Sequence, residues 1–134
     1  MTEFDYHPML PVGPDQTEYR QISSDFVTRL ELDGRPFIKI DPAGLRMLAR
    51  QAFEDVSHLL RASHLAQLRA ILEDPEASRN DRFVALEMLK NAVISADRVL
   101  PMCQDTGTAI VSAVRGEQVL TGGADARALS EGIF

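Results

Sequence analysis

The residues whose types and spacing could do chemistry lie together in the run Cys103-Gln104-Asp105-Thr106-Gly107. Cys103 is the only cysteine in the sequence. Its thiolate could act as a nucleophile or as a metal ligand, while an amide can donate a hydrogen bond and a carboxylate can move a proton. A lone cysteine is commonly a small buried hydrophobe. The polar neighbours of Cys103 favour a functional thiol instead.

The flanking sequence predicts that this run is a loop between a helix and a strand. Proline disfavours helical backbone in the residue before it, so Leu100 should be extended and Pro101 should begin a loop. Asp105-Thr106-Gly107 has the composition of a turn. The apolar run Ala109–Val114 then predicts a buried strand. We therefore expect a polar loop that carries a thiol and is held by regular structure on both sides.

Two chemistries for Cys103 differ in what else they require. A nucleophilic thiol needs a base, and the sequence places none of the three histidines, His7, His58 and His64, near Cys103. His58 and His64 are six residues apart, about 240° around a continuous helix, and so are a poor metal-binding pair. A metal ligand fits the loop better than a nucleophile. One thiolate, however, cannot hold an iron–sulfur cluster, which several cysteines ordinarily bind.

The segment from Val99 to Val111, VLPMCQDTGTAIV, resembles the cluster-binding segment of class I (iron–sulfur) fumarate hydratases. In that family a cysteine followed by Gln-Asp-Thr-Gly-Thr lies in a loop, and the CQDTGT block is the specific part of the resemblance. The resemblance extends over nearly the whole chain. Outside the loop, the segments that carry it are Glu18-Tyr19, Leu48–Phe53, Asp74–Ser78, Leu120–Gly123 and Ala128–Ser130.

The resemblance implies an enzyme, a hydro-lyase of the tricarboxylic acid cycle that interconverts fumarate and (S)-malate at a 4Fe–4S cluster. It implies that Cys103 is the first of three cysteine ligands and that the other two follow the position of Phe134. Gln104 and Asp105 would contact the small dicarboxylate substrate, and Asp105 would be a catalytic residue that acts as the base or orients one. The resemblance also implies a homodimer.

Two alternatives to a fumarate hydratase stay open at this point. Tartrate dehydratase is a related hydro-lyase that shares the cluster segment, and nothing in that segment reports on a second substrate hydroxyl. In a different class of protein, the chain could be a non-catalytic helical interaction module whose Cys103 is a redox-sensitive thiol. The interaction module is distinguished from the enzymes by whether the reading frame continues past Phe134 and supplies two more cysteines. The residues that discriminate fumarate from tartrate should also lie beyond that position.

Composition narrows the partners that the chain could have. The 134 residues are 45% apolar and 25% charged, which is ordinary for one globular domain. A net charge of −6 argues against nucleic acid as a partner. No apolar run is long enough to predict a membrane span, and no signal peptide is apparent. The single cysteine is consistent with the reducing cytoplasm.

The hydrophobic pattern predicts an α+β fold that is predominantly helical. We expect an N-terminal arm over residues 1–24, and the resemblance implies that residues 25–134 are the N-terminal part of an iron–sulfur hydro-lyase domain that is truncated at residue 134. The fragment alone should hold no stable cluster and should be inactive. A hairpin is predicted over Phe26–Ile40 with its turn at Asp33-Gly34.

Three helices with short connections should follow the hairpin and pack antiparallel around one core. The first begins with Asp41 as N-cap and Pro42 as its first residue, the second lies between Ser63 and Asp74, and the third has Asn80 as a plausible cap. After the cysteine, strands are predicted over Ala109–Val114 and Gln118–Thr121. Gly122-Gly123 should break the chain, and Asp125 should cap a last helix.

Overall fold

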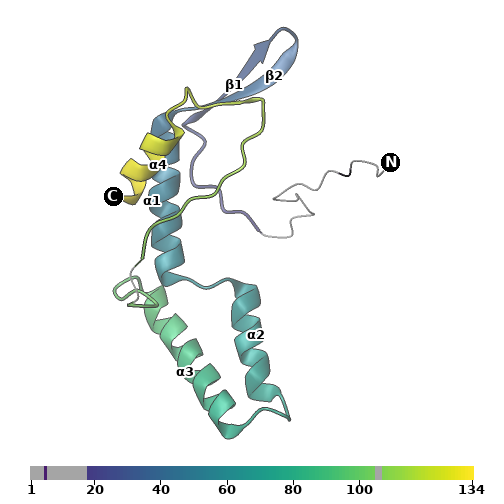
Figure 1. The fold of residues 1–134 in the computed structure, drawn as a ribbon, viewed down its shortest axis with the longest axis vertical. Helices are drawn as coiled ribbons and strands as arrows, with labels where there is room; N and C mark the ends of the chain where they lie inside the picture. The colour runs from purple at the N-terminus through teal and green to yellow at the C-terminus, as the bar shows by residue number, and fades with distance from the viewer. Residues whose placement is uncertain (1–4, 6–17, 105–106) are drawn as a thin grey trace.

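The computed structural model describes Asp5, residues 18–104 and residues 107–134 of the chain. Within these ranges it contains four helices and one three-stranded sheet (Figure 1). The predicted α+β class, with helix predominant, is confirmed. In chain order the elements are β1 (Val27–Leu32), β2 (Arg35–Ile40), α1 (Pro42–His58), α2 (Ala62–Glu73), α3 (Arg79–Ala96), β3 (Val119–Leu120) and α4 (Asp125–Ile133).

The first two strands form the predicted antiparallel hairpin. Its register runs from the Val27–Ile40 pair to the Leu32–Arg35 pair, so Asp33 and Gly34 are the two turn residues. Both have positive φ, 52° and 70°, as a tight hairpin turn requires, and Asp and Gly tolerate this conformation. The hairpin prediction is therefore confirmed, including its turn.

Helix α1 begins as the sequence predicts and packs mainly against α4. Asp41 caps it by accepting a hydrogen bond from the Ala43 N–H at 2.8 Å. Small residues let the two helices approach closely: Ala49 and Ala128 are buried, and a Cβ built on Gly132 would meet the backbone oxygen of Arg46 and lie 2.8 Å from the Ala49 Cβ. The contact between α1 and α4 therefore leaves no room for a larger side chain at Gly132.

Helices α2 and α3 form a separate antiparallel hairpin, with Leu68 and Ala85 buried in it. The expected single core of three helices is wrong for α1, which lies beyond the end of this hairpin and has α4 as its main partner (Figure 1). The predicted cap of α3 is also wrong. Ser78 caps the helix rather than Asn80, because the Ser78 and Asp81 side chains each accept a hydrogen bond from the other residue's backbone N–H.

The strand predicted over Ala109–Val114 is absent from the described residues, which is a correction to the sequence analysis. Ile110 and Val114 are 79% and 71% exposed, so this apolar run is not buried. A strand forms only where a partner accepts its backbone hydrogen bonds. The second prediction, Gln118–Thr121, is confirmed in a shorter form as β3, which pairs parallel with β2 at Ile38 and Lys39.

The chain turns at Gly122 and Gly123, both with positive φ, and enters α4. Asp125 is the first residue of this helix rather than its cap, which is Ala124. The Asp125 carboxylate instead accepts a hydrogen bond from the Thr121 hydroxyl at 2.8 Å and pairs with Arg115 at 3.2 Å. These contacts tie the entry of α4 to the preceding segment.

Among the described residues, no helix has the length and apolar character that crossing a membrane would require.

Candidate functional site

The candidate site is the segment from Asp97 to Gln104, which we call the cysteine loop and which follows α3. Cys103 and Gln104 both occupy exposed positions. Asp105, predicted to be catalytic, and Thr106 lie outside the described residues. The structure therefore presents the predicted thiol and the predicted amide at neighbouring surface positions, beside the ends of α1 and α3.

The residue before Cys103 is held from two sides. The Met102 N–H donates a hydrogen bond to the Ser57 carbonyl oxygen in the last turn of α1 at 2.9 Å. The Met102 carbonyl oxygen accepts one from the Asn91 side-chain amide of α3 at 2.7 Å. Because both polar groups of one backbone residue are bound, the chain direction at Cys103 is set by two different helices.

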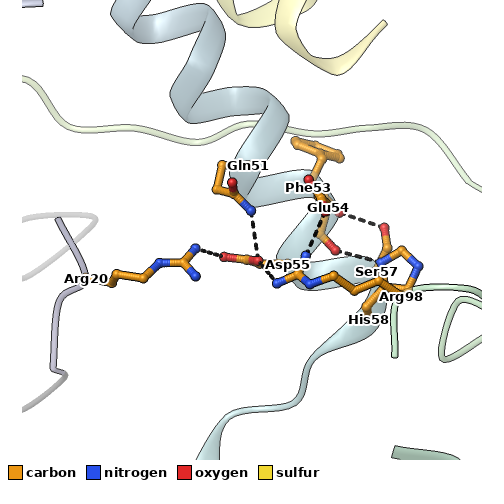
Figure 2. A network of polar contacts seen from close by, with 8 residues as sticks. All are labelled: Arg20, Gln51, Phe53, Glu54, Asp55, Ser57, His58 and Arg98. Carbon is orange, nitrogen blue, oxygen red and sulfur yellow. Dashed lines mark hydrogen bonds and ion pairs between the residues drawn. The ribbon is translucent and has the colours of Figure 1, made fainter. Parts of the chain in front are cut away.

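A second attachment of the cysteine loop comes from Arg98 (Figure 2). Its guanidinium donates to the Glu54 carboxylate at 3.0 Å and to the Asp55 carboxylate at 2.6 Å. Asp55 also accepts hydrogen bonds from Gln51 at 3.1 Å and from Arg20 at 2.7 Å. The C-terminal half of α1 thus carries a polar network that reaches both the loop and the segment around Arg20.

The backbone conformation of Arg98 ends α3 and begins the cysteine loop. Its φ is 61°, in the left-handed region that a residue with a long side chain rarely adopts. The Arg98 N–H donates to the Ser95 carbonyl oxygen at 2.9 Å, so the left-handed residue ends α3 in the way a glycine commonly does. Arginine occupies this place with its side chain bound to α1, which offsets part of the conformational cost.

The charges of the network reinforce one another. The hydrogen bond from Arg98 is the largest of the effects that lower the pKa of Asp55 below its ordinary value of 3.8, with further lowering from Gln51 and Arg20. In return, the hydrogen bond to Asp55 raises the pKa of Arg98. Asp55 is therefore ionised at neutral pH and can bind both cations at once.

The described residues contain no group of three His, Cys, Asp or Glu side chains placed to bind one metal ion. His58 lies with its Nδ1 2.8 Å from the Glu54 carbonyl oxygen of its own helix, and His64 is exposed on α2. The chain's single thiol, at an exposed loop position, has the chemistry of one cluster ligand. A cluster held by several thiolates would need ligands that this sequence does not contain.

The residues that position the loop were not found from the sequence. Glu54 and Asp55 lie in a helix of mixed charge and carry no local sign of a distant partner, yet they bind Arg98, which lies 44 and 43 positions further along the chain. Asn91 gave a weak signal, because asparagine is unfavourable inside a helix unless its side chain has a partner. No local pattern predicts that the Ser57 carbonyl oxygen accepts a hydrogen bond from Met102, because this contact depends on tertiary structure alone.

A sequence model of the family described as Fumarate hydratase (Fumerase) matches residues 46–134, which is more than half of the chain. The chain belongs to this family. The matched range includes the C-terminal part of α1, the α2–α3 hairpin, the cysteine loop and α4. The resemblance noted from the CQDTGT block is confirmed.

Particular relatives agree over almost the whole chain. "Fumarate hydratase class I, anaerobic" of Escherichia coli (strain K12) is 49% identical over 131 residues, which cover 98% of this chain and 24% of that protein. "Fumarate hydratase 1, mitochondrial" of Leishmania major is 50% identical over 137 residues, which cover 100% and 25%. "Fumarate hydratase 2" of Leishmania major is 52% identical over 121 residues, which cover 89% and 21%. The chain spans about a quarter of the length of these relatives.

Proposed function

We propose that this chain is the N-terminal part of an iron–sulfur fumarate hydratase, a hydro-lyase that interconverts fumarate and (S)-malate. The observation that carries the proposal is identity of about one half to proteins named fumarate hydratase, over 98% of this chain. The matched range is long enough to include the cysteine loop. The names of these relatives favour fumarate over tartrate as the substrate.

Cys103 is the residue of this chain that would hold the 4Fe–4S cluster. Its thiol fits as a ligand because it is exposed, lies on a loop and follows a residue whose backbone is fixed by Ser57 and Asn91. The remaining ligands would come from the part of the family's length that this chain does not span. When bound, such a cluster supplies a Lewis-acidic iron for a substrate hydroxyl.

The chain's own polar residues would then handle the substrate. The Gln104 amide can donate to a carboxylate or hydroxyl oxygen of a dicarboxylate, which suits its exposed position beside Cys103. Removing water from malate requires that a proton leave the carbon next to a carboxylate. Asp105 would take that proton or orient the group that takes it. We also place the enzyme in the cytoplasm as a homodimer.

The test is an anaerobic hydration assay on the complete enzyme after reconstitution with iron and sulfide, with fumarate and tartrate measured side by side. Activity on fumarate that is lost in air is the expected result. Activity on tartrate alone would assign the related dehydratase instead. Absence of both activities and of bound iron would contradict the proposal and favour a helical interaction module.

Cys103→Ser in the same enzyme should abolish cluster retention and the hydration of fumarate, because a hydroxyl is a poorer iron ligand than a thiolate. Thr28→Ser is the control, an equally small change at an exposed position of β1, away from the cysteine loop (Figure 1). Iron content, sulfide content and the visible absorption of the cluster are the readouts. A cluster-loaded and active Cys103→Ser enzyme would overturn the ligand assignment.

Asp105→Asn should separate chemistry from cluster binding. We expect the cluster to be retained and kcat to fall by about a hundredfold or more, the usual contribution of a positioned acid or base. Unchanged turnover would reduce Asp105 to a turn residue.

A further inference from the structure

We propose that Asp55 is a positioning residue that couples two segments distant in sequence, the segment around Arg20 and the cysteine loop. The placement of Cys103 would then depend on whether the Arg20 segment is docked on α1. The coupling itself concerns this chain's own contacts. Its consequence for catalysis rests on the proposed function, in which Cys103 is a cluster ligand.

The two arginines use different oxygens of one carboxylate. Arg20 Nη2 lies 2.7 Å from Asp55 Oδ2, and Arg98 Nη2 lies 2.6 Å from Asp55 Oδ1. Gln51 Nε2 lies 3.1 Å from the same Oδ1 and holds the carboxylate in this orientation. Both arginines therefore bind simultaneously, and Figure 2 shows them approaching Asp55 from opposite sides.

The contact reaches Cys103 through a short stretch of chain. The cysteine loop is attached to the last turns of α1 at Arg98 and at Met102. Arg98 binds Glu54 and Asp55, and the Met102 N–H binds Ser57. If Arg98 separates from Asp55, the loop loses one of the contacts that join it to α1. A loop with fewer attachments opens more often, and its amides exchange faster with solvent.

Two of the apolar side chains in the cysteine loop contribute little burial. Val99 and Leu100 are 81% and 59% exposed, whereas Met102 is half-buried. Polar contacts therefore contribute to the loop's position, and Asp55 is the residue that links one of them, the ion pair with Arg98, to the Arg20 segment. The side chain of Asp55 is 30% exposed and that of Arg98 is 31% exposed, so both are partly shielded from water, whereas Arg20 is 61% exposed.

The test is hydrogen exchange of the Met102 amide, measured by NMR in the 134-residue chain. This amide reports on the loop because its hydrogen bond to Ser57 is the attachment next to Cys103. The Leu68 amide, in the α2–α3 hairpin, reports on global opening, and its exchange should speed up by less than that of the Met102 amide. If the Met102 amide exchanged in the wild type as fast as in an unstructured peptide, the proposal would be overturned.

Asp55→Asn and Arg98→Gln should speed Met102 exchange about five- to tenfold. Arg20→Gln should speed it about two- to threefold, because an exposed ion pair is weaker. Arg69→Gln is the matched control. It breaks the Arg69–Glu73 pair on α2 and should leave the Met102 amide unchanged.

Two further variants distinguish coupling from general damage. Arg98→Lys keeps the charge and should restore part of the protection lost in Arg98→Gln. Arg20→Gln added to Asp55→Asn should have no further effect, because the coupling passes through the missing carboxylate. A full Arg20→Gln effect in the Asp55→Asn background, or no effect in the wild-type background, would overturn the proposal.

If Asp55→Asn loses its helical circular dichroism, Arg20→Gln and Arg98→Lys decide the question in its place. These readouts need no cluster, so the two proposals fail separately. A complete enzyme without iron would refute the proposed function and leave the exchange results standing. If the complete enzyme is active and holds its cluster, but the variants of the 134-residue chain show unchanged exchange at Met102, only the coupling is refuted.

Discussion

The two halves of α1 are attached to the rest of the chain in different ways. Its N-terminal half contacts α4 through small residues, with Ala49 and Ala128 only 4% and 2% exposed. Its C-terminal half presents Asp55 and Ser57, which bind the segment around Arg20 and the cysteine loop through polar groups. One helix therefore serves both as a packing element and as a support for a loop.

The difference shows what each kind of contact can do. Close packing of small residues excludes water and tolerates little added volume, so it stabilises one arrangement of two helices. Polar contacts at the surface contribute less free energy, but they specify direction and can position a loop whose apolar side chains are largely exposed. A loop that carries an exposed cysteine can be positioned in the second way.

The largest loss of stability should come from adding volume where α4 packs against the N-terminal half of α1. Gly132→Ala would place a Cβ against the Arg46 backbone oxygen and 2.8 Å from the Ala49 Cβ. Overpacking of this kind costs about 1–3 kcal/mol, which more than offsets the better helix propensity of alanine. Urea denaturation followed by circular dichroism measures the loss.

Gly116→Ala is the control for this change. A Cβ at Gly116 would meet only Val119, at 3.9 Å, and Gly116 does not have positive φ. Equal stability of Gly132→Ala and the wild type would show that α1 and α4 do not approach as closely as described.

Local signals predicted the parts of the fold that depend on neighbouring residues. The Asp33-Gly34 turn and the Asp41-Pro42 helix start are determined within a few residues, and both are confirmed. The strand expected over Ala109–Val114 was wrong because an apolar run specifies burial only when a partner covers it. Ile110 and Val114 remain exposed in the described structure.

In the candidate site, too, the residues themselves could be predicted from the sequence, but the contacts that position them could not. Cys103 and Gln104 could be picked out from the sequence because the block that contains them is distinctive. The contacts that position them join Arg98 to Glu54 and Asn91 to Met102 across 44 and 11 positions. No periodicity or capping rule relates residues at such separations, so these contacts required the tertiary structure.

A smaller loss of stability, and one that depends on pH, should follow from removing the charge of Asp55 in the C-terminal half of α1. The folded state lowers the pKa of Asp55 below 3.8, so its contribution to stability is present above the unfolded pKa and is lost as pH falls through the folded pKa. Arg20, Arg98 and Glu54 are the charged groups around it.

Asp55→Asn should therefore cost about 1 kcal/mol or less at pH 7. The difference from the wild type should shrink once the pH falls below 3.8, as the wild-type carboxyl becomes protonated. Urea denaturation of both chains from pH 7 to pH 3 measures this. A difference that stayed constant over the whole range would mean that the ionised carboxylate is not what stabilises this half.

The smallest effect should come from the one polar contact described between α1 and α4, the pair of Arg46 and Glu131 at 2.6 Å. Their side chains are 51% and 36% exposed, and Glu131 also binds Arg127, so water and a second arginine can replace Arg46. Arg46→Gln should leave the urea midpoint within error of the wild type. If instead it lowered the midpoint as far as Gly132→Ala, the N-terminal half of α1 would be held by charge, like the C-terminal half, and the contrast between the two halves would disappear.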